Sequence, residues 1–301
     1  MLIRATGFRS AGIGFVVWLA LWLPIPFAAR APGLIDRLFL LAPLAIVPLG
    51  MRLQLLPQAV RVAQPVFAAL VVISFLSRTG IAAALLVVPW LLLGGACGVM
   101  GLLRLWRSGV RRMDEICVHV ALIYWPIGCL WLLISRLGMN PLGFSDDIVL
   151  LTAVHFHYAG FAALTMLGMT GKFSEGMLYR AAAWGAIAGI PSLALGITFS
   201  ASLECAAALL LALSLVSAAG ITAFVVLPRL VHRAARVMLA VSSASVVATM
   251  LLAGIYALGK YNGRDWLDIP EMAAVHGVIN ALGFSLCALV GWNLEGTAAA
   301  K

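Results

Sequence analysis

Ten long apolar runs divide this chain of 301 residues, and each is long enough to cross a membrane as a helix. A crossing needs about 20 residues, because about 30 Å of hydrocarbon is spanned at about 1.5 Å per residue. With 63% apolar and 10% charged residues, the chain has too few polar groups to cover a water-facing surface. The sequence therefore predicts an all-α fold, a polytopic transmembrane helical bundle, and excludes a soluble enzyme. The expected spans are approximately 11–29, 34–51, 62–78, 80–103, 116–136, 148–170, 181–199, 202–227, 236–259 and 271–292.

The connections between the runs are short, so we expect residues 1–301 to form a single integral membrane domain. Of the 20 Lys and Arg residues, 14 lie in one set of alternate connections, which includes both termini, and 6 lie in the other. The positive-inside rule makes the first set cytoplasmic, so both termini are predicted to be inside. This topology accounts for the net charge of +9. We therefore expect the lipid bilayer as partner and no nucleic acid, and the oligomeric state stays open.

A few polar residues lie inside the spans, where they are costly and often functional. The sixth span contains His155, His157 and Tyr158, and the tenth contains His276 and Asn280. Counted from the predicted outer face, the three histidines lie roughly 8–15 Å deep, so they can share one layer in the outer half of the bilayer. This layer is the candidate substrate-, proton- or cation-binding site. Interhelical hydrogen bonding is the alternative reading of the same residues.

The spacing of these residues limits how they can act together. His155 and His157 are separated by roughly 200° around a helix, so in a regular helix they face opposite ways and cannot bind one metal ion. His276 and Asn280 are four residues apart and share a face. Acidic residues lie above the layer, and they either concentrate cations there or are ordinary loop acids. These acids are Asp146, Asp147, Glu204, Asp265, Asp268 and Glu271, of which Glu204 and Glu271 are assigned to the candidate site.

Glycines at GxxxG spacing lie in two spans, Gly94 with Gly98 and Gly185 with Gly189. Such pairs allow helix backbones to approach closely, so we expect them at helix–helix contacts.

The segment Val154-His155-Phe156-His157-Tyr158-Ala159-Gly160-Phe161 resembles the YndJ-like family of bacterial polytopic membrane proteins. His276-Gly277 and Asn280-Ala281-Leu282-Gly283-Phe284 fit that family's second polar signature. The resemblance implies a multi-pass protein of the bacterial inner (cytoplasmic) membrane. It implies no particular activity.

The four residues His155-Phe156-His157-Tyr158 also resemble the His-x-His helix of the catalytic subunit of haem–copper oxidases. There the two histidines ligate two different haems from opposite faces of the helix. The resemblance implies a haem or transition metal held by His155, His157 and His276. The chain departs from that family in having no tandem histidine pair and no His-Pro-Glu-Val-Tyr run.

Three functions stay open. The first is a permease or exporter of a small solute or cation, since ten spans in about 300 residues resemble the drug/metabolite transporter superfamily in size and topology. The second is a haem- or metal-binding redox protein, and the third is a structural or assembly subunit. The sequence has no ATP-binding GxxxxGK[ST] loop and no serine nucleophile elbow, which favours transport over enzymatic activity.

Overall fold

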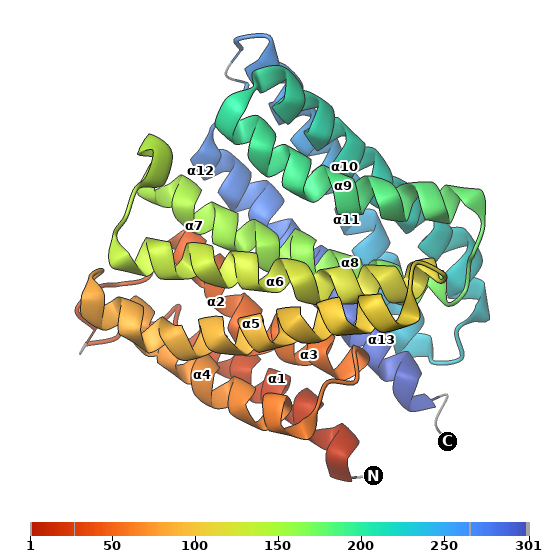
Figure 1. Ribbon diagram of the computed structural model, residues 1–301, viewed down its shortest axis with the longest axis horizontal. Helices are drawn as coiled ribbons and strands as arrows, with labels where there is room; N and C mark the ends of the chain where they lie inside the picture. Colours follow the sequence, from red (N-terminus) through yellow and green to blue (C-terminus); the bar gives the residue numbers. More distant parts are fainter. Residues whose placement is uncertain (1, 27, 265, 299–301) are drawn as a thin grey trace. The chain divides into compact units, whose positions relative to one another are not determined.

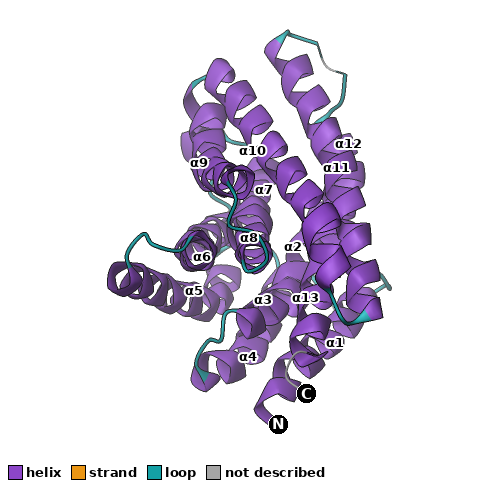
Figure 2. Ribbon diagram, turned by 90° about the vertical axis from the view of Figure 1, so that its right-hand side faces the viewer, coloured by secondary structure: helices purple, strands orange, loops and turns teal. Residues whose placement is uncertain are grey.

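Helices and the loops between them make up the described part of the chain in this computed structural model, which covers residues 2–26, 28–264 and 266–298 (Figures 1 and 2). No strand occurs within those ranges. The chain forms two compact units. Unit 1 comprises Met1–Arg107 and His119–Ala162, and unit 2 comprises Ser108–Val118 and Ala163–Lys301. The predicted all-helical, polytopic fold class is confirmed.

Unit 1 is built from the helices of the first half of the chain. They are α1 (Leu2–Ala20), α2 (Leu34–Leu41), η1 (Ala42–Ile46), α3 (Val47–Leu53), α4 (Gln58–Leu76), α5 (Ile81–Ser108), α6 (Met113–Leu137), η2 (Pro141–Gly143), α7 (Asp146–His155) and η3 (Phe156–Ala163). The segments α2, η1 and α3 follow one another without a break and together form one span. The last residue of α5, the first six residues of α6 and the last residue of η3 belong to unit 2.

Unit 2 contains the remaining helices. They are α8 (Leu164–Gly171), α9 (Met177–Phe199), α10 (Ala201–Ile221), η4 (Thr222–Val226), η5 (Leu227–Arg229), α11 (Arg233–Tyr261), α12 (Ile269–Met272), η6 (Ala273–Gly277), η7 (Ile279–Leu286) and α13 (Cys287–Ala298). Helix α10 packs along α9 and also against α11. Helix α11 in turn packs against η7 and α13, so it contacts elements on two sides.

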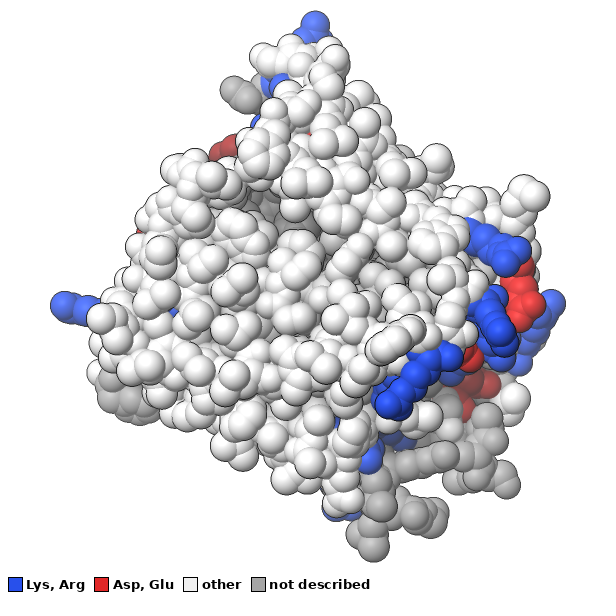
Figure 3. All heavy atoms as spheres, viewed as in Figure 1, with Lys and Arg blue, Asp and Glu red and all other residues white. Residues whose placement is uncertain are grey.

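Nine helices within the described ranges are long and apolar enough to cross a membrane, and they coincide with nine of the ten predicted runs. The prediction for 11–29 differs from the structure, because α1 comprises Leu2–Ala20 and so ends nine residues before the predicted end of the span. The apolar run continues through Pro24 and Pro26, and a residue that precedes proline is disfavoured in helical conformation. Most of the surface atoms drawn in Figure 3 belong to uncharged residues, as a lipid-facing surface requires.

Both predicted glycine pairs lie at close helix contacts. In unit 1, a Cβ at Gly94 would lie 2.6 Å from Cys129 Sγ on α6, and one at Gly98 would lie 2.8 Å from the ring of Pro126. In unit 2, Gly185 and Gly189 of α9 face α10 in the same way. The absence of a side chain thus sets the helix spacing.

A buried arginine joins α4 to α6 in unit 1. The side chain of Arg136 is 1% exposed, and its Nη2 donates to the carbonyls of Ser74 (2.8 Å) and Ser77 (3.0 Å). Its Nε donates to Ser74 Oγ at 3.1 Å, and the guanidinium lies 4.7 Å from the ring centroid of Phe75. These carbonyls lie at the end of α4, where a helix has unpaired acceptors and a partial negative charge.

Five π-helical segments interrupt the described helices, namely η1, η3, η4, η6 and η7. Such segments are rare and occur frequently at functional sites. Of the five intramembrane polar residues that the sequence singles out, four lie in three of these segments, His157 and Tyr158 in η3, His276 in η6 and Asn280 in η7, whereas His155 is the last residue of α7. Three of the five π-helical segments therefore contain residues that the intramembrane polarity also marks.

Candidate functional site

His155 and His157 face opposite ways, as their spacing predicts. His155 is the last residue of α7 and is exposed, and its Nδ1 lies 2.8 Å from the carbonyl of Leu151. His157 is 0% exposed and lies in the interior of unit 1. The interior histidine is therefore His157, a choice that the two-residue spacing alone leaves open.

Both ring nitrogens of His157 are hydrogen-bonded within the protein. Its Nδ1 lies 2.8 Å from the carbonyl of Ala153, and its Nε2 lies 3.1 Å from Nε1 of Trp90. A carbonyl only accepts and an indole N–H only donates, so Nδ1 carries the proton and Nε2 is the acceptor. His157 is therefore a neutral imidazole whose hydrogen-bonding capacity is satisfied by unit 1 itself.

Aromatic rings enclose this imidazole. Trp90 is stacked on it at 6.2 Å between ring centroids, and Phe39 meets it edge-on at 5.0 Å. On α6, Gly128 leaves room for the ring, because a Cβ there would lie 2.7 Å from His157 Nδ1. Cys129 Sγ lies 3.9 Å from Nε2. The surroundings are those of a packed core residue, and a metal at Nε2 would have to displace the indole N–H of Trp90.

Tyr158 also has a structural contact. Its hydroxyl donates to the carbonyl of Leu38 at 2.8 Å, across 120 residues of sequence, and its side chain is buried. The bond joins η3 to α2, two elements of unit 1.

In unit 2, His276 and Asn280 form a polar site with Thr249 of α11. Asn280 Nδ2 lies 3.0 Å from His276 Nε2, and His276 Nδ1 lies 3.0 Å from the carbonyl of Thr249. The hydroxyl of Thr249 lies 2.9 Å from Asn280 Oδ1. His276 and Asn280 are half-buried, whereas Thr249 is almost completely buried. These three residues are called the His276 site below.

The hydrogen bonds of the His276 site can be arranged in two ways. With the carbonyl of Thr249 as acceptor, Nδ1 of His276 is protonated and Nε2 accepts from the Asn280 amide. The single hydroxyl proton of Thr249 has other acceptors within reach, the carbonyls of Ser245 (3.0 Å) and Val246 (3.2 Å). Rotation of the amide by 180° would exchange its donor and acceptor ends, and the hydroxyl can turn to match. The site can therefore present either a donor or an acceptor to Nε2.

The two acids assigned to the site have structural partners. Glu271 and Asp268 form a capping box at the start of α12, with backbone-to-carboxylate distances of 2.7 and 2.9 Å. Glu204 Oε1 forms an ion pair with Lys260 Nζ at 2.6 Å, which joins α10 to α11. Asp265, another of the acidic residues predicted to lie above the histidine layer, is outside the described residues. Helix capping and ion pairing account for the positions of Glu271 and Glu204.

The predicted shared layer of histidines stays a prediction, because His155 and His157 belong to unit 1 and His276 belongs to unit 2. In the part of the chain that the structure describes, no group of three or more His, Cys, Asp or Glu residues is arranged to hold a metal ion. Nε2 of both His157 and His276 is engaged by a neighbouring side chain. None of these observations supports the haem or metal alternative.

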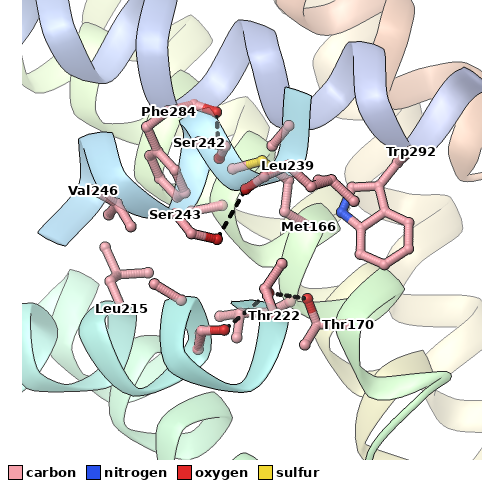
Figure 4. Close-up of a pocket in the computed structure, with 15 residues that line it drawn as sticks. Met166, Thr170, Leu215, Thr222, Leu239, Ser242, Ser243, Val246, Phe284 and Trp292 are labelled. Carbon is pink, nitrogen blue, oxygen red and sulfur yellow. Dashed lines mark hydrogen bonds between the residues drawn. The ribbon is translucent and has the colours of Figure 1, made fainter. Parts of the chain in front are cut away.

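A small cavity lies within unit 2, between α8, α10, η4, α11, η7 and α13 (Figure 4). Its volume is about 30 Å³, enough for about two water molecules. Four hydroxyl-bearing residues line it among apolar ones, namely Thr170, Thr222, Ser242 and Ser243. Ser242 Oγ donates to the carbonyl of Phe284 at 2.9 Å. The cavity is too small for an organic solute but polar enough for water.

Sequence reasoning did not identify Thr249 or this cavity. A signal was present, because Ser242, Ser245 and Thr249 recur at spacings of three and four residues and therefore share one face of the ninth span. Hydroxyl side chains commonly bond to the carbonyl four residues earlier in their own helix, so this pattern alone does not distinguish a site from local bonding.

Fold and composition together define an integral membrane protein with many transmembrane helices. The YndJ-like protein family model matches residues 37–284, and the chain belongs to this family. A relative, the uncharacterized membrane protein YndJ of Bacillus subtilis (strain 168), is 33% identical over 198 residues, which are 64% of this chain and 35% of the relative. The chain thus matches about a third of that relative's length. No solved structure matches the chain. The family match includes both the His155–Tyr158 segment and the His276 site.

Proposed function

We propose that this chain is a permease for a small cation and that the His276 site binds the cation during transport. The supporting observation is that His276, Asn280 and Thr249 are each hydrogen-bonded to the other two. His276 and Asn280 are half-buried. Polar groups inside a membrane are costly and mark ion pathways in pumps and transporters. The two residues on the tenth span also lie in π-helical segments, where such sites are frequent.

The site suits transport because its hydrogen bonds can be exchanged without loss. When Nε2 of His276 binds a cation or a proton, the Asn280 amide can turn its oxygen toward Nε2 and its nitrogen toward Thr249 Oγ1. The hydroxyl of Thr249 then donates to the carbonyl of Ser245, which already lies at 3.0 Å. Occupied and empty states would both leave the buried polar groups paired, which keeps the cost of binding and release small.

The proposal includes an orientation in the bacterial cytoplasmic membrane. The excess of Lys and Arg in one set of connections places both termini in the cytoplasm by the positive-inside rule. The tenth span then enters from the outer face, and His276, five residues after Glu271, lies in the outer half of the bilayer.

Purified protein in proteoliposomes on a solid-supported membrane tests the proposal. Rapid jumps in H⁺, Na⁺ or K⁺ concentration should produce a transient current for at least one of these ions. His276→Ala, Asn280→Leu and Thr249→Val should each reduce this current at least tenfold. Thr198→Val is the matched control, because its hydroxyl donates only to a carbonyl of its own helix, that of Ala194 at 2.8 Å.

Absence of current for all three ions, or currents that are the same in the three site variants as in Thr198→Val, would refute the proposed function. If the site variants lowered only the thermal stability of the protein, the site would have a structural role, and the chain would be a structural membrane subunit.

A further inference from the structure

A row of hydroxyl side chains extends from the His276 site along α11. Ser245 lies one turn before Thr249, and Ser242 lies one turn further back. The three share one face of the helix over about 10 Å, at about 1.5 Å per residue. Three hydroxyl side chains thus share one face of a helix in a chain with 63% apolar residues.

This row faces η7, and the two elements are in close contact. Gly283 of η7 lies directly against the hydroxyl of Ser245, so that a Cβ at position 283 would overlap with Ser245 Oγ. One residue further along η7, the carbonyl of Phe284 accepts the hydroxyl of Ser242 at 2.9 Å. Asn280, one turn before Phe284, belongs to the His276 site. The α11–η7 contact therefore has a polar group of η7 at each end of the turn from Asn280 to Phe284, the Asn280 amide and the Phe284 carbonyl.

The row ends at the cavity of unit 2. Ser242 lines this cavity together with Ser243, Thr170 and Thr222 (Figure 4). Thr170 Oγ1 and Thr222 Oγ1 lie 3.4 Å apart, and each hydroxyl keeps capacity to accept a hydrogen bond from water. About two water molecules fit in this polar space. Hydroxyl side chains thus lie one turn apart along α11, from the His276 site to a water-sized polar cavity of the same unit.

We propose that the cation is a proton, and that it moves between His276 and water in this cavity along the α11–η7 contact. This inference rests on the proposed function and specifies its substrate. In the orientation proposed above, α11 starts at the cytoplasmic face, so the cavity lies on the cytoplasmic side of His276.

The ligands of the His276 site favour a proton over a metal cation. The site offers one imidazole, one amide and one hydroxyl, without a carboxylate, whereas hard cations such as Ca²⁺ take six to eight oxygen ligands. A proton needs a single lone pair, which His276 Nε2 supplies once the Asn280 amide turns. The hydrogen-bond partners of the imidazole on α11 and η7, the Thr249 carbonyl and the Asn280 amide, are uncharged, and Glu271, five residues earlier in the sequence, caps α12.

The proton balance closes over one cycle. Nε2 of neutral His276 takes a proton from a protonated water on one side and becomes imidazolium. Asn280 turns, and the Thr249 hydroxyl reorients toward the carbonyl of Ser245. The imidazolium then releases its Nε2 proton to the other side, which on the cytoplasmic side means transfer along the α11–η7 contact to water in the cavity, and the amide and hydroxyl return. No bond to a heavy atom forms or breaks, and no redox partner is required.

A luminal pH measurement tests the proposal. Proteoliposomes contain the pH dye pyranine and potassium, and valinomycin creates a potential, negative inside, that draws protons inward. We expect the lumen to acidify faster than in protein-free liposomes. Gly283→Ala, which places a methyl group against Ser245, should slow acidification at least tenfold. Gly254→Ala, also in unit 2, is the matched control, because its Cβ would lie at an ordinary 3.7 Å from Leu209.

Ser242→Ala adds no volume and removes only the hydroxyl between Phe284 and the cavity. It therefore tests the proton route even if Gly283→Ala does not fold. We expect it to slow acidification at least threefold.

The outcomes separate this inference from the proposed function. Na⁺ or K⁺ currents that require His276, without luminal acidification, would overturn the inference and leave the permease intact. Acidification that requires His276 but is unchanged in both Gly283→Ala and Ser242→Ala would overturn the route. Absence of current for every ion would overturn both.

Discussion

At the scale of single residues, His157 and His276 have different surroundings. His157 is enclosed by aromatic rings and satisfied by Trp90 and a backbone carbonyl, as expected for a core residue. His276 is half-buried and bonded to a side chain that can exchange donor for acceptor. The difference lies in whether the partner of Nε2 can change, because an indole N–H only donates, whereas an amide can donate or accept.

Trp90→Phe tests the role of His157. The substitution keeps a ring but removes the only donor that Trp90 has, so the buried Nε2 of His157 loses that hydrogen bond. An unsatisfied buried acceptor costs about 1–3 kcal/mol, and we expect the free energy of unfolding in detergent to fall by that amount. Trp184→Phe, at an exposed tryptophan, is the control and should change it far less. Equal losses in the two variants would contradict the assignment.

The buried Arg136 gives a second prediction at this scale. Arg136→Met removes three hydrogen bonds to Ser74 and Ser77 and leaves the carbonyls at the end of α4 without their cationic donor. We expect a loss of about 2–4 kcal/mol in the free energy of unfolding, since bonds to charged groups contribute about 1.5–3 kcal/mol each and are not additive. Arg78→Ala, in the exposed loop after α4, should stay within about 0.5 kcal/mol of the parent protein. A loss no larger than that of Arg78→Ala would contradict the account.

At the scale of helices, the spacing between α9 and α10 depends on glycine. A Cβ at Gly196 would overlap with the backbone of Glu204, which cannot move without shifting α10. Gly196→Ala should therefore lower the melting temperature markedly, with a cost of about 1–3 kcal/mol. Gly220→Ala on α10 is the matched control, since no atom lies within 4 Å of the new Cβ. Because alanine favours helix over glycine, the control should be neutral or stabilising by up to about 1 kcal/mol.

The capping box of α12 tests whether Glu271 serves the helix or the cation. Glutamine at this position keeps an acceptor for the backbone N–H of Asp268, so Glu271→Gln retains the cap while removing the charge. If capping is the role of Glu271, the ion-jump currents and the melting temperature of this variant should match those of the parent protein. Loss of current at unchanged stability would instead place the carboxylate in the cation site.

Much of this element structure could be predicted from the sequence, because membrane spans depend mainly on local composition. The expected span 11–29 differs from α1 because the apolar run continues past Ala20 through Pro24, where helical conformation is disfavoured for the residue before proline. The π-helical segments could not be predicted, since they depend on contacts with other helices. Likewise, the spacing of His155 and His157 gives opposite faces, but the inner one is selected by Trp90, 67 residues earlier.

At the scale of the whole molecule, the distribution of charge predicts the orientation. The connections with the excess of Lys and Arg should face the cytoplasm, with both termini inside. A fluorescent protein fused to the C-terminus should therefore be fluorescent in a bacterial host, and alkaline phosphatase fused there should be inactive. Active phosphatase at the C-terminus would reverse the orientation and place the His276 site in the inner half of the bilayer.

The central claim is that His276, and neither of the histidines in the sixth span, is the cation-binding residue. Ion-jump currents from His155→Ala, His157→Phe and His276→Ala, normalised to the amount of folded protein, test it most directly. We predict that His155→Ala retains the current, that His157→Phe loses stability but retains current per folded molecule, and that His276→Ala loses the current at least tenfold. A current that persists in His276→Ala and disappears in His155→Ala or His157→Phe would contradict the account.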